Sequence, residues 1–371
     1  MLSAVKLAVV TMALLLDQIE WGNPILPAVD DPAWEAEAKR RVGRVGEIDR
    51  RVAPNPWVRE LCVAAVSYQP AHVPMRLFNI AGFVTAQENA CRYCYGANRA
   101  ALKVMGFSET LIRQIERDAA VADLDTRERA VITFCRNLAR AKPRPSRAAL
   151  EQLVDLGYST AVANELALLI ASFCFYNRIG VLTACPPERA FERFANGPLG
   201  RVMGAVAPLM TRLRRPSRPV ADDSGEFAAG PFGGLVATLA GLPAARIVKT
   251  ALDGAFASDV VSRPTKALMF AIVGRALDCR YTEAEARALL AADGYDAASV
   301  DAAVRTLADA RLPPREAPLL SWVRDTVHYQ TGAVQARTRA LLNDIGRDAT
   351  LEAIGVAALA NGAVRLAMLL A

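Results

Sequence analysis

The chain has few of the residues that build metal centres or nucleic-acid surfaces. Only two of its 371 residues are histidines, His72 and His328, and they stand far apart, which leaves little for a zinc or di-iron site. Aromatic residues make up 6% of the chain, and 44 Lys and Arg against 38 Asp and Glu give a net charge of +6. Over this length the bias is weak, so we expect no nucleic-acid partner.

The cysteines also lack the number and spacing that are typical of secreted, disulfide-bonded proteins. The seven cysteines are odd in number and irregularly spaced, unlike a disulfide scaffold. Most stand in apolar helical runs, as Cys62 and Cys174 do, where cysteine behaves as a small hydrophobic residue. These features favour a reducing compartment, and we predict a cytoplasmic protein.

Apolar runs occur near both ends of the chain. Residues 7–16 have the size of a signal-peptide core, but no cleavage-site pattern follows, and ten residues cannot span a bilayer. Residues 351–371 are long enough, but Glu352, Asn361 and Arg365 interrupt them. We interpret the first run as a packed helix, with a signal peptide as the alternative, and the second as a buried helix. We expect no membrane span.

The sequence is rich in patterns typical of helices. It is 53% hydrophobic, which excludes a disordered or collagen-like chain. Apolar residues recur at steps of three and four, β-branched alternation is scarce, and Gly106 and Gly157 stand where helix C-caps are expected. We predict an all-α protein. The clearest helical segments are residues 109–122, 126–140, 147–156 and 160–184.

Length and composition predict more than one domain. A chain of 371 residues exceeds what one core usually fills. Residues 196–233 are rich in Pro, Gly, Arg and Ser and predict a linker, with phosphate binding by its arginines as the alternative. The predicted parts are an N-terminal helical extension (1–50), a first domain (51–195), the linker, and a second domain (234–371).

The two sides of this linker resemble each other at an offset of 188 residues. Residues 91–93, Cys-Arg-Tyr, recur as residues 279–281, and further matches extend over about 45 residues. The pattern predicts a duplicated helical unit with one active and one degenerate copy. Three polar or thiol residues of the first copy are replaced in the second: Cys94 by Thr282, Glu88 by Ala276 and Asn98 by Ala286.

The stretch around Cys91 and Cys94 is the part of the chain with the clearest chemistry. On a helix these residues share a face, with Cα atoms about 5 Å apart, within the range that a disulfide bridges. Near a helix N-terminus, unpaired N–H groups lower the pKa of a thiol and favour the reactive thiolate. Two helix starts fit the sequence, a capping box over residues 85–88 or an N-cap at Asn89.

Other interpretations of the Cys-x-x-Cys pattern meet obstacles. A zinc site wants four ligands, and no second such pair is present. Covalent haem attachment wants His directly after the second cysteine, where Tyr95 stands. A thioredoxin motif needs flanking strands, which the sequence does not predict. Two buried cysteines in a helical core stay as the alternative to a redox pair.

Five short segments carry a resemblance to a known family. They are residues 88–94 (Glu-Asn-Ala-Cys-Arg-Tyr-Cys), 100–102, 106–108, the helix containing 127–131, and 175–178 (Phe-Tyr-Asn-Arg). With them, residues from 60 to 190 resemble the carboxymuconolactone decarboxylase and alkylhydroperoxidase D (AhpD) superfamily, in its peroxidase-related branch. The resemblance implies an AhpD-like helical domain, assembly into a homo-oligomer, and a redox pair in which Cys94 attacks the peroxide and Cys91 is the resolving thiol.

Two positions depart from the family pattern. The family commonly has His four residues after the second cysteine and Glu twelve residues before the first, where this chain has Asn98 and Asn79. Asparagine can donate a hydrogen bond to a thiolate but cannot shuttle a proton. Glu88, one turn before Cys91, could substitute as the base, with a helix cap as its alternative role.

From these features we predict a thiol-dependent hydroperoxide or disulfide reductase, an antioxidant oxidoreductase. The predicted catalytic residues are Cys94, Cys91, Glu88 and Asn98. Its partners would be a small hydroperoxide or disulfide substrate and an external thiol reductant, with no metal and no organic cofactor. The second unit would pack on the first in the place of a second subunit. The alternatives are a decarboxylase-like enzyme that does not use the cysteines and a non-catalytic oligomeric scaffold.

Overall fold

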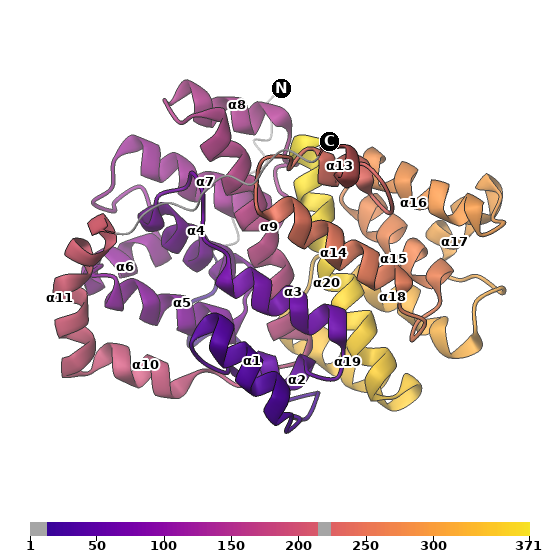
Figure 1. Cartoon of the computed structure of the whole chain (residues 1–371), viewed down its shortest axis with the longest axis horizontal. Coiled ribbons are helices and arrows are strands. Elements are labelled where there is room, and N and C mark those ends of the chain that lie inside the picture. The colour runs from indigo at the N-terminus through magenta and orange to yellow at the C-terminus, as the bar shows by residue number, and fades with distance from the viewer. Residues whose placement is uncertain (1–12, 214–223) are drawn as a thin grey trace, which may run out of the picture.

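The computed structural model describes residues 13–213 and 224–371, and these residues form helices and no strands (Figure 1). The predicted all-α class is therefore confirmed. The first half holds α1 (Pro32–Val42), α2 (Glu47–Val52), α3 (Pro56–Ser67), α4 (Met75–Glu88), α5 (Arg92–Val104), α6 (Glu109–Arg117), α7 (Thr126–Arg140), α8 (Arg147–Asp155), α9 (Thr160–Leu182), α10 (Arg189–Asn196) and α11 (Pro198–Leu213). The second half holds α12 (Ser224–Phe227), α13 (Gly233–Ala237), α14 (Ala244–Ala257), α15 (Arg263–Ala276), α16 (Arg280–Ala292), α17 (Ala297–Thr306), the 3₁₀ turn η1 (Pro314–Glu316), α18 (Pro318–Asp325), α19 (Thr331–Ile345) and α20 (Arg347–Leu370).

Local signals explain where the predicted helices begin and end. The side chains of Ser108, Asp125 and Ser159 each accept a hydrogen bond from a backbone N–H in the first turn of α6, α7 and α9. Gly106 and Gly157 adopt φ values of +87° and +91°. Both glycines therefore act as the predicted helix terminators, since few other residues tolerate this conformation.

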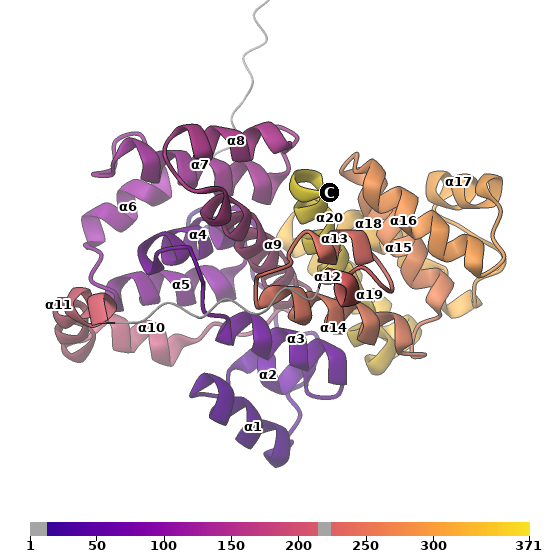
Figure 2. The same cartoon turned by 45° about the horizontal axis from the view of Figure 1, so that its top comes forward.

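The core is organised around α9 and α20, which lie side by side at the centre of the molecule (Figures 1 and 2). A Cβ added at Gly362 of α20 would lie 2.9 Å from the carbonyl oxygen of Ala171 on α9, so glycine permits this close approach. Both helices are long and apolar enough to cross a membrane, but 83% and 89% of their apolar windows are buried inside the protein. The C-terminal run is thus a buried helix, as predicted.

The helices flanking α9 and α20 follow the 188-residue offset of the sequence. α4 and α15 start and end at positions that differ by that offset, and so do α5 and α16. Cys91 and Cys279 are the N-cap residues of α5 and α16, and the residues before them, Ala90 and Asp278, both have positive φ, at +45° and +54°. Residues that are 188 positions apart in these helices therefore share backbone conformation as well as residue identity.

The predicted linker over residues 196–233 contains a regular helix, because α11 occupies Pro198–Leu213. Residues 196–233 as a whole are rich in Pro, Gly and Arg, but the first part of this segment also contains an apolar repeat, which the linker prediction did not take into account. Residues 214–223, which hold most of its charge, lie outside the described residues, and so do residues 1–12, with most of the predicted N-terminal packed helix.

Candidate functional site

The cysteine pair lies at the turn between α4 and α5. α4 ends at Glu88, and the backbone N–H of Cys91 donates to the carbonyl of Ala86 at 3.1 Å, a C-capping hydrogen bond that accompanies the left-handed Ala90. Cys91 is then the N-cap of α5, and its Sγ accepts a hydrogen bond from the backbone N–H of Cys94 at 3.3 Å. The helix thus begins at neither of the two predicted starts.

The two sulfur atoms are in contact and enclosed. Cys91 Sγ lies 2.7 Å from Cys94 Sγ, and both residues are free thiols. Cys91 is fully buried and Cys94 is 3% exposed. Gly180 of α9 makes room for them, since a Cβ there would lie 2.9 Å from Cys91 Sγ and 3.4 Å from Cys94 Sγ. At the positions 188 residues later, Cys279 Sγ lies 3.3 Å from Thr282 Oγ1, so a hydroxyl stands where Cys94 has its thiol.

The electrostatics of the pair differ from the expectation of an activated thiolate. Burial, followed by the neighbouring Cys91, raises the pKa of the Cys94 thiol well above its usual value. The backbone N–H of Cys94, the third residue of α5, lowers the pKa of the Cys94 thiol, but this effect is smaller than that of burial, and the same N–H donates a hydrogen bond to Cys91 Sγ. Burial therefore favours the neutral, protonated form of the Cys94 thiol.

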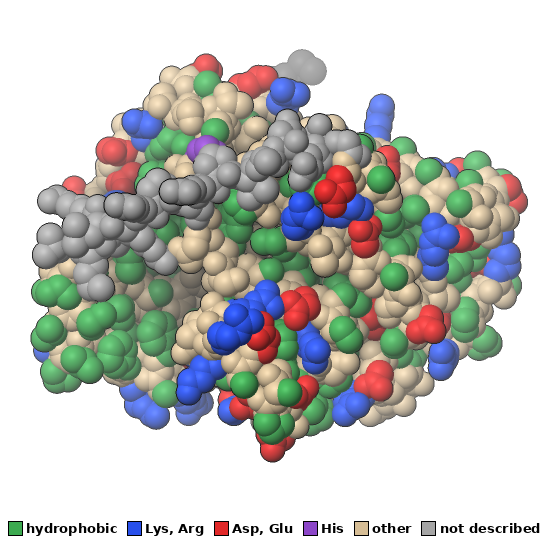
Figure 3. Space-filling model, in the orientation of Figure 1, with side chains coloured by type: hydrophobic (Ala, Val, Ile, Leu, Met, Phe, Trp, Pro, Cys, Tyr) green, Lys and Arg blue, Asp and Glu red, His purple; other side chains and the backbone are tan. Residues whose placement is uncertain are grey.

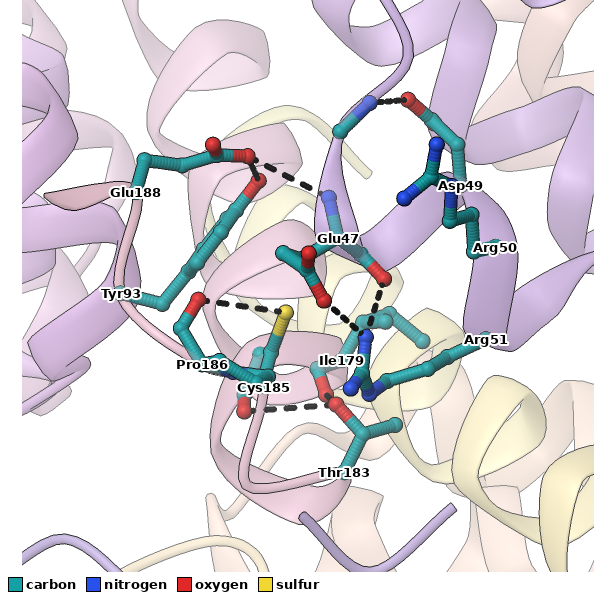
Figure 4. Close-up of polar contacts among 12 residues, drawn as sticks. Glu47, Asp49, Arg50, Arg51, Tyr93, Ile179, Thr183, Cys185, Pro186 and Glu188 are labelled. Carbon is teal, nitrogen blue, oxygen red and sulfur yellow. Dashed lines mark hydrogen bonds and ion pairs between the residues drawn. The ribbon is translucent and has the colours of Figure 1, made fainter. Parts of the chain in front are cut away.

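A third thiol, Cys185, lies beside the pair. It follows α9 (Figure 4), and its backbone N–H donates to the carbonyl of Gly180 at 2.9 Å. Burial raises the pKa of Cys185 well above its usual value, and Cys91 contributes to the rise. No sequence motif marks Cys185, because its closeness to Cys91 depends on how α9 packs against α5.

Carboxylates approach the same region from α2 and from the loop before α10. Tyr93 donates its hydroxyl proton to Glu188 Oε1 at 3.0 Å (Figure 4). Arg44 forms an ion pair with the same oxygen at 3.2 Å. Asp49 accepts a hydrogen bond from the backbone N–H of Gly46 at 2.7 Å, and burial raises the pKa of its carboxyl. Sequence reasoning missed Glu188 and Asp49, since both are distant from the cysteines along the chain.

The predicted partners Asn98 and Glu88 point elsewhere. Asn98 donates from Nδ2 to the backbone carbonyl of Cys94 at 2.8 Å, not to its sulfur. The carboxylate of Glu88 binds Arg140 and lies 3.5 Å from Arg136, both on α7. Burial raises the pKa of Glu88, although Arg140 opposes the rise. Among the hydrogen bonds of the described residues, neither side chain reaches a sulfur.

The second half of the chain holds the turn that precedes Cys91. The hydroxyl of Tyr329 donates to the carbonyl of Asn89 at 2.8 Å, and that of Thr331 donates to the carbonyl of Ala90 at 3.3 Å. Arg178 of α9 lies under the ring of Tyr329 and donates to Asn89 Oδ1 at 3.4 Å. The position of the cysteine pair therefore depends on contacts from both halves.

Comparison with known proteins adds no identification. No family model matches the chain, and no curated protein or solved structure is significantly similar to it. Among the described residues, no group of three or more His, Cys, Asp and Glu side chains is placed to hold a metal ion. The case for function therefore rests on the geometry of the site and on the sequence resemblance.

Proposed function

We propose that Cys91 and Cys94 form a dithiol–disulfide couple that reduces a small hydroperoxide. The observation that carries this proposal is the 2.7 Å contact between two free thiols at a helix start, opposite a glycine that leaves them room. With exposures of 0% and 3%, the sulfurs suit a small hydroperoxide better than a disulfide on a protein surface. Of the two substrate classes predicted from the sequence, hydroperoxides and disulfides, we therefore propose hydroperoxides.

The proposed reaction has two steps. The sulfur of Cys94 attacks the terminal oxygen of the hydroperoxide, the O–O bond breaks, and the alcohol leaves with the proton that Cys94 gives up. The sulfur of Cys91 then attacks the sulfenic acid on Cys94, so that the S–S bond forms and water leaves. An external dithiol returns two electrons and two protons to the pair. A reducing cytoplasm, which we propose as its location, supplies such thiols.

Proton transfer in this proposal uses residues other than those expected. Since Glu88 is engaged by α7, we assign the handling of protons to Glu188, which accepts a hydrogen bond from Tyr93, the residue before Cys94. The raised pKa of Cys94 makes such assistance necessary, because little thiolate is present before the substrate enters.

The second half fits the role of a built-in partner. The coincident helix boundaries of α4–α5 and α15–α16 support an origin by duplication, and Cys279 with Thr282 supports loss of the redox function in that copy. The contacts of Tyr329 and Thr331 with the turn before Cys91 support its packing role. Higher assembly into a homo-oligomer belongs to the same proposal.

The burial of both sulfurs also favours a second candidate, a non-catalytic scaffold in which the pair only fills space. Treatment of the reduced, folded protein with tert-butyl hydroperoxide distinguishes the two. We expect a Cys91–Cys94 disulfide, detected by mass spectrometry as a loss of two hydrogens in the linking peptide. C91S should instead accumulate a sulfenic acid on Cys94 that dimedone traps, and C94S should not react.

A matched control is C135S, since Cys135 is also a fully buried thiol on a helix, but the thiol that it interacts with is Cys174 and not Cys91 or Cys94. It should oxidise like the wild type. If the folded wild type forms no Cys91–Cys94 disulfide, or if C94S consumes peroxide as fast as the wild type does, the redox proposal is wrong and the scaffold stands.

A further inference from the structure

Two buried arginines lack the acidic partner that other buried basic side chains of this protein have. On the face drawn in Figure 3, charged side chains of both signs lie interspersed at the surface. Arg51 and Lys266 are buried, but each forms an ion pair with a glutamate, at 2.5 Å and 3.1 Å. Arg178 and Arg365 are 1% and 0% exposed, and no described Asp or Glu lies within ion-pair distance of either.

The two arginines belong to one cluster between the halves of the chain. Arg178 of α9 donates from Nε to the carbonyl of Thr326 at 3.1 Å, and Arg365 of α20 donates from Nη1 to Asn361 Oδ1 at 2.9 Å. Asn361 in turn donates from Nδ2 to Thr326 Oγ1 at 3.1 Å, so the two side chains are linked through Thr326 and Asn361. Burial, followed by the charge of Arg178, lowers the pKa of Arg365 to about 9, so Arg365 still carries its charge at pH 7.

Only partial charges face these two full charges. The hydrogen bonds of both arginines go to backbone carbonyls and to the side-chain oxygens of Asn89 and Asn361. A charge removed from water is costly unless opposite charge and hydrogen bonds compensate it. The Nη2 of Arg365 is buried and has no hydrogen-bond partner among the described residues, so its N–H groups are left for a ligand.

The supply of free donors indicates how large this ligand is. Each guanidinium nitrogen of Arg178 already donates to an oxygen atom, so the free N–H groups of the pair are those of Arg365. An oxyanion such as phosphate has several oxygens that need donors, and most of them would be left unpaired here. A monatomic anion needs few donors and brings the missing negative charge.

The cluster reaches the surface at His328. This residue is exposed and stands between Val327, whose carbonyl accepts from Arg178, and Tyr329, whose ring centroid lies 5.6 Å from the guanidinium carbon of Arg178. Partial burial, followed by the charge of Arg365, lowers the pKa of His328 to about 4. The imidazole therefore lies in the field of both arginines, on the side from which an anion would enter.

We propose that Arg178 and Arg365 bind a monatomic anion, chloride, between the two halves of the chain. The Nη2 of Arg365 donates to the anion, and both guanidinium groups attract it by their charge. Because the two arginines also bind the ends of α7 and α18, the anion stabilises the contact of α9 and α20 with these helices. The proposal does not depend on the redox chemistry of Cys91 and Cys94.

Thermal unfolding of the full chain in sodium chloride and in sodium gluconate, at equal ionic strength, tests this proposal. An anion that binds only the folded protein raises its Tm, so we expect a Tm that is about 3 °C or more higher in chloride. Arg365→Met should lose most of this difference. The matched control is Arg51→Met, which should keep the difference, because Arg51 is also buried but has a carboxylate partner.

The wild type alone gives a second test, which does not require a variant to fold. His72 and His328 are the only histidines of the chain, so proton NMR can follow the titration of each. Bound chloride offsets the charge of the arginines, so the pKa of His328 should be about half a pH unit higher in chloride than in gluconate, and that of His72 should not change.

Three results would each overturn the proposal. They are a wild-type Tm that is the same in both salts, a chloride effect on the Tm that Arg365→Met retains in full, and a pKa of His328 that does not respond to chloride.

Discussion

Arg178 and Arg365 are buried on the two central helices, and each reaches the C-terminal end of a helix in the opposite half. Arg178 of α9 donates to the carbonyls of Thr326 and Val327 at the end of α18, at 3.1 Å each. Arg365 of α20 donates to the carbonyl of Ala139 near the end of α7, at 3.2 Å. A helix C-terminus carries a partial negative charge, so these hydrogen bonds from the two arginines cap the helices. They also join the two halves of the chain.

Replacement of Arg178 by Met should lower the free energy of unfolding by about 3 kcal/mol, because hydrogen bonds from a charged group are lost and buried carbonyls are left without donors. Arg365→Met should cost less, about 1–2 kcal/mol, since the Nη2 of Arg365 has no hydrogen-bond partner among the described residues. Urea denaturation followed by circular dichroism measures both values. A larger loss for Arg365→Met than for Arg178→Met would contradict this account.

Replacement of Gly180 by Ala should slow disulfide formation at the cysteine pair. The new Cβ would lie 2.9 Å from Cys91 Sγ, so the sulfur must shift from its present position. We expect the rate of Cys91–Cys94 oxidation by peroxide to fall at least tenfold, as measured by quenched-flow thiol trapping.

The matched control for that substitution is Gly274→Ala in α15. A Cβ at Gly274 would lie 3.3 Å from the Cβ of Thr282, so the crowding falls on α16 and not on the cysteine pair. This variant should lose stability but keep the oxidation rate of the wild type. Equal oxidation rates in the Gly180 and Gly274 variants would show that Gly180 has no special relation to the pair.

The helices could be predicted from the sequence because their signals are local. Capping residues such as Ser108 and Ser159, and terminators such as Gly106, act within one turn of the chain. The start of α5 could not be predicted in the same way. Ala90 takes a left-handed conformation that alanine rarely adopts, and contacts from Tyr329 and Thr331 help to hold it there.

The polar residues of the C-terminal run show the same limit. Glu352, Asn361 and Arg365 interrupt an apolar sequence, and their roles cannot be predicted from the sequence alone. In the structure, Glu352 accepts a hydrogen bond from Trp57 at 2.8 Å and lies 3.1 Å from Lys266, which joins α3, α15 and α20. These partners of Glu352 are distant along the chain, so only the fold reveals them.

The reactivity of Cys94 should rise with pH well beyond neutrality. Because burial raises the pKa of Cys94, the folded thiol binds its proton more tightly than an unfolded thiol with a pKa of about 8.5. The rate of alkylation of the reduced, folded protein at Cys94 by iodoacetamide should therefore still increase above about pH 9, where the urea-unfolded protein levels off. If the alkylation rate of the folded protein levelled off at a lower pH than that of the unfolded protein, Cys94 would instead be an activated thiolate.

The same shift predicts how stability changes with pH. The neutral thiol of Cys94 contributes stability that is fully present below the unfolded pKa of about 8.5 and is lost as the pH rises through the higher folded pKa. The free energy of unfolding of C94A should accordingly fall less steeply above about pH 9 than that of the wild type, measured by urea denaturation. Parallel curves for the two proteins would contradict the raised pKa.

Replacement of Ala90 by Gly should stabilise the protein, although glycine usually destabilises. Ala90 has φ of +45°, a conformation that costs a residue with a Cβ about 1–2 kcal/mol and glycine almost nothing. Part of this gain is offset because glycine loses more conformational freedom on folding, so we expect a net increase of about 0.5–1 kcal/mol in the free energy of unfolding. Ala97→Gly, inside α5, is the control and should lower it by about 1 kcal/mol. If both substitutions destabilise equally, the turn before Cys91 is not strained in solution, and its backbone conformation needs no support from Tyr329 or Thr331.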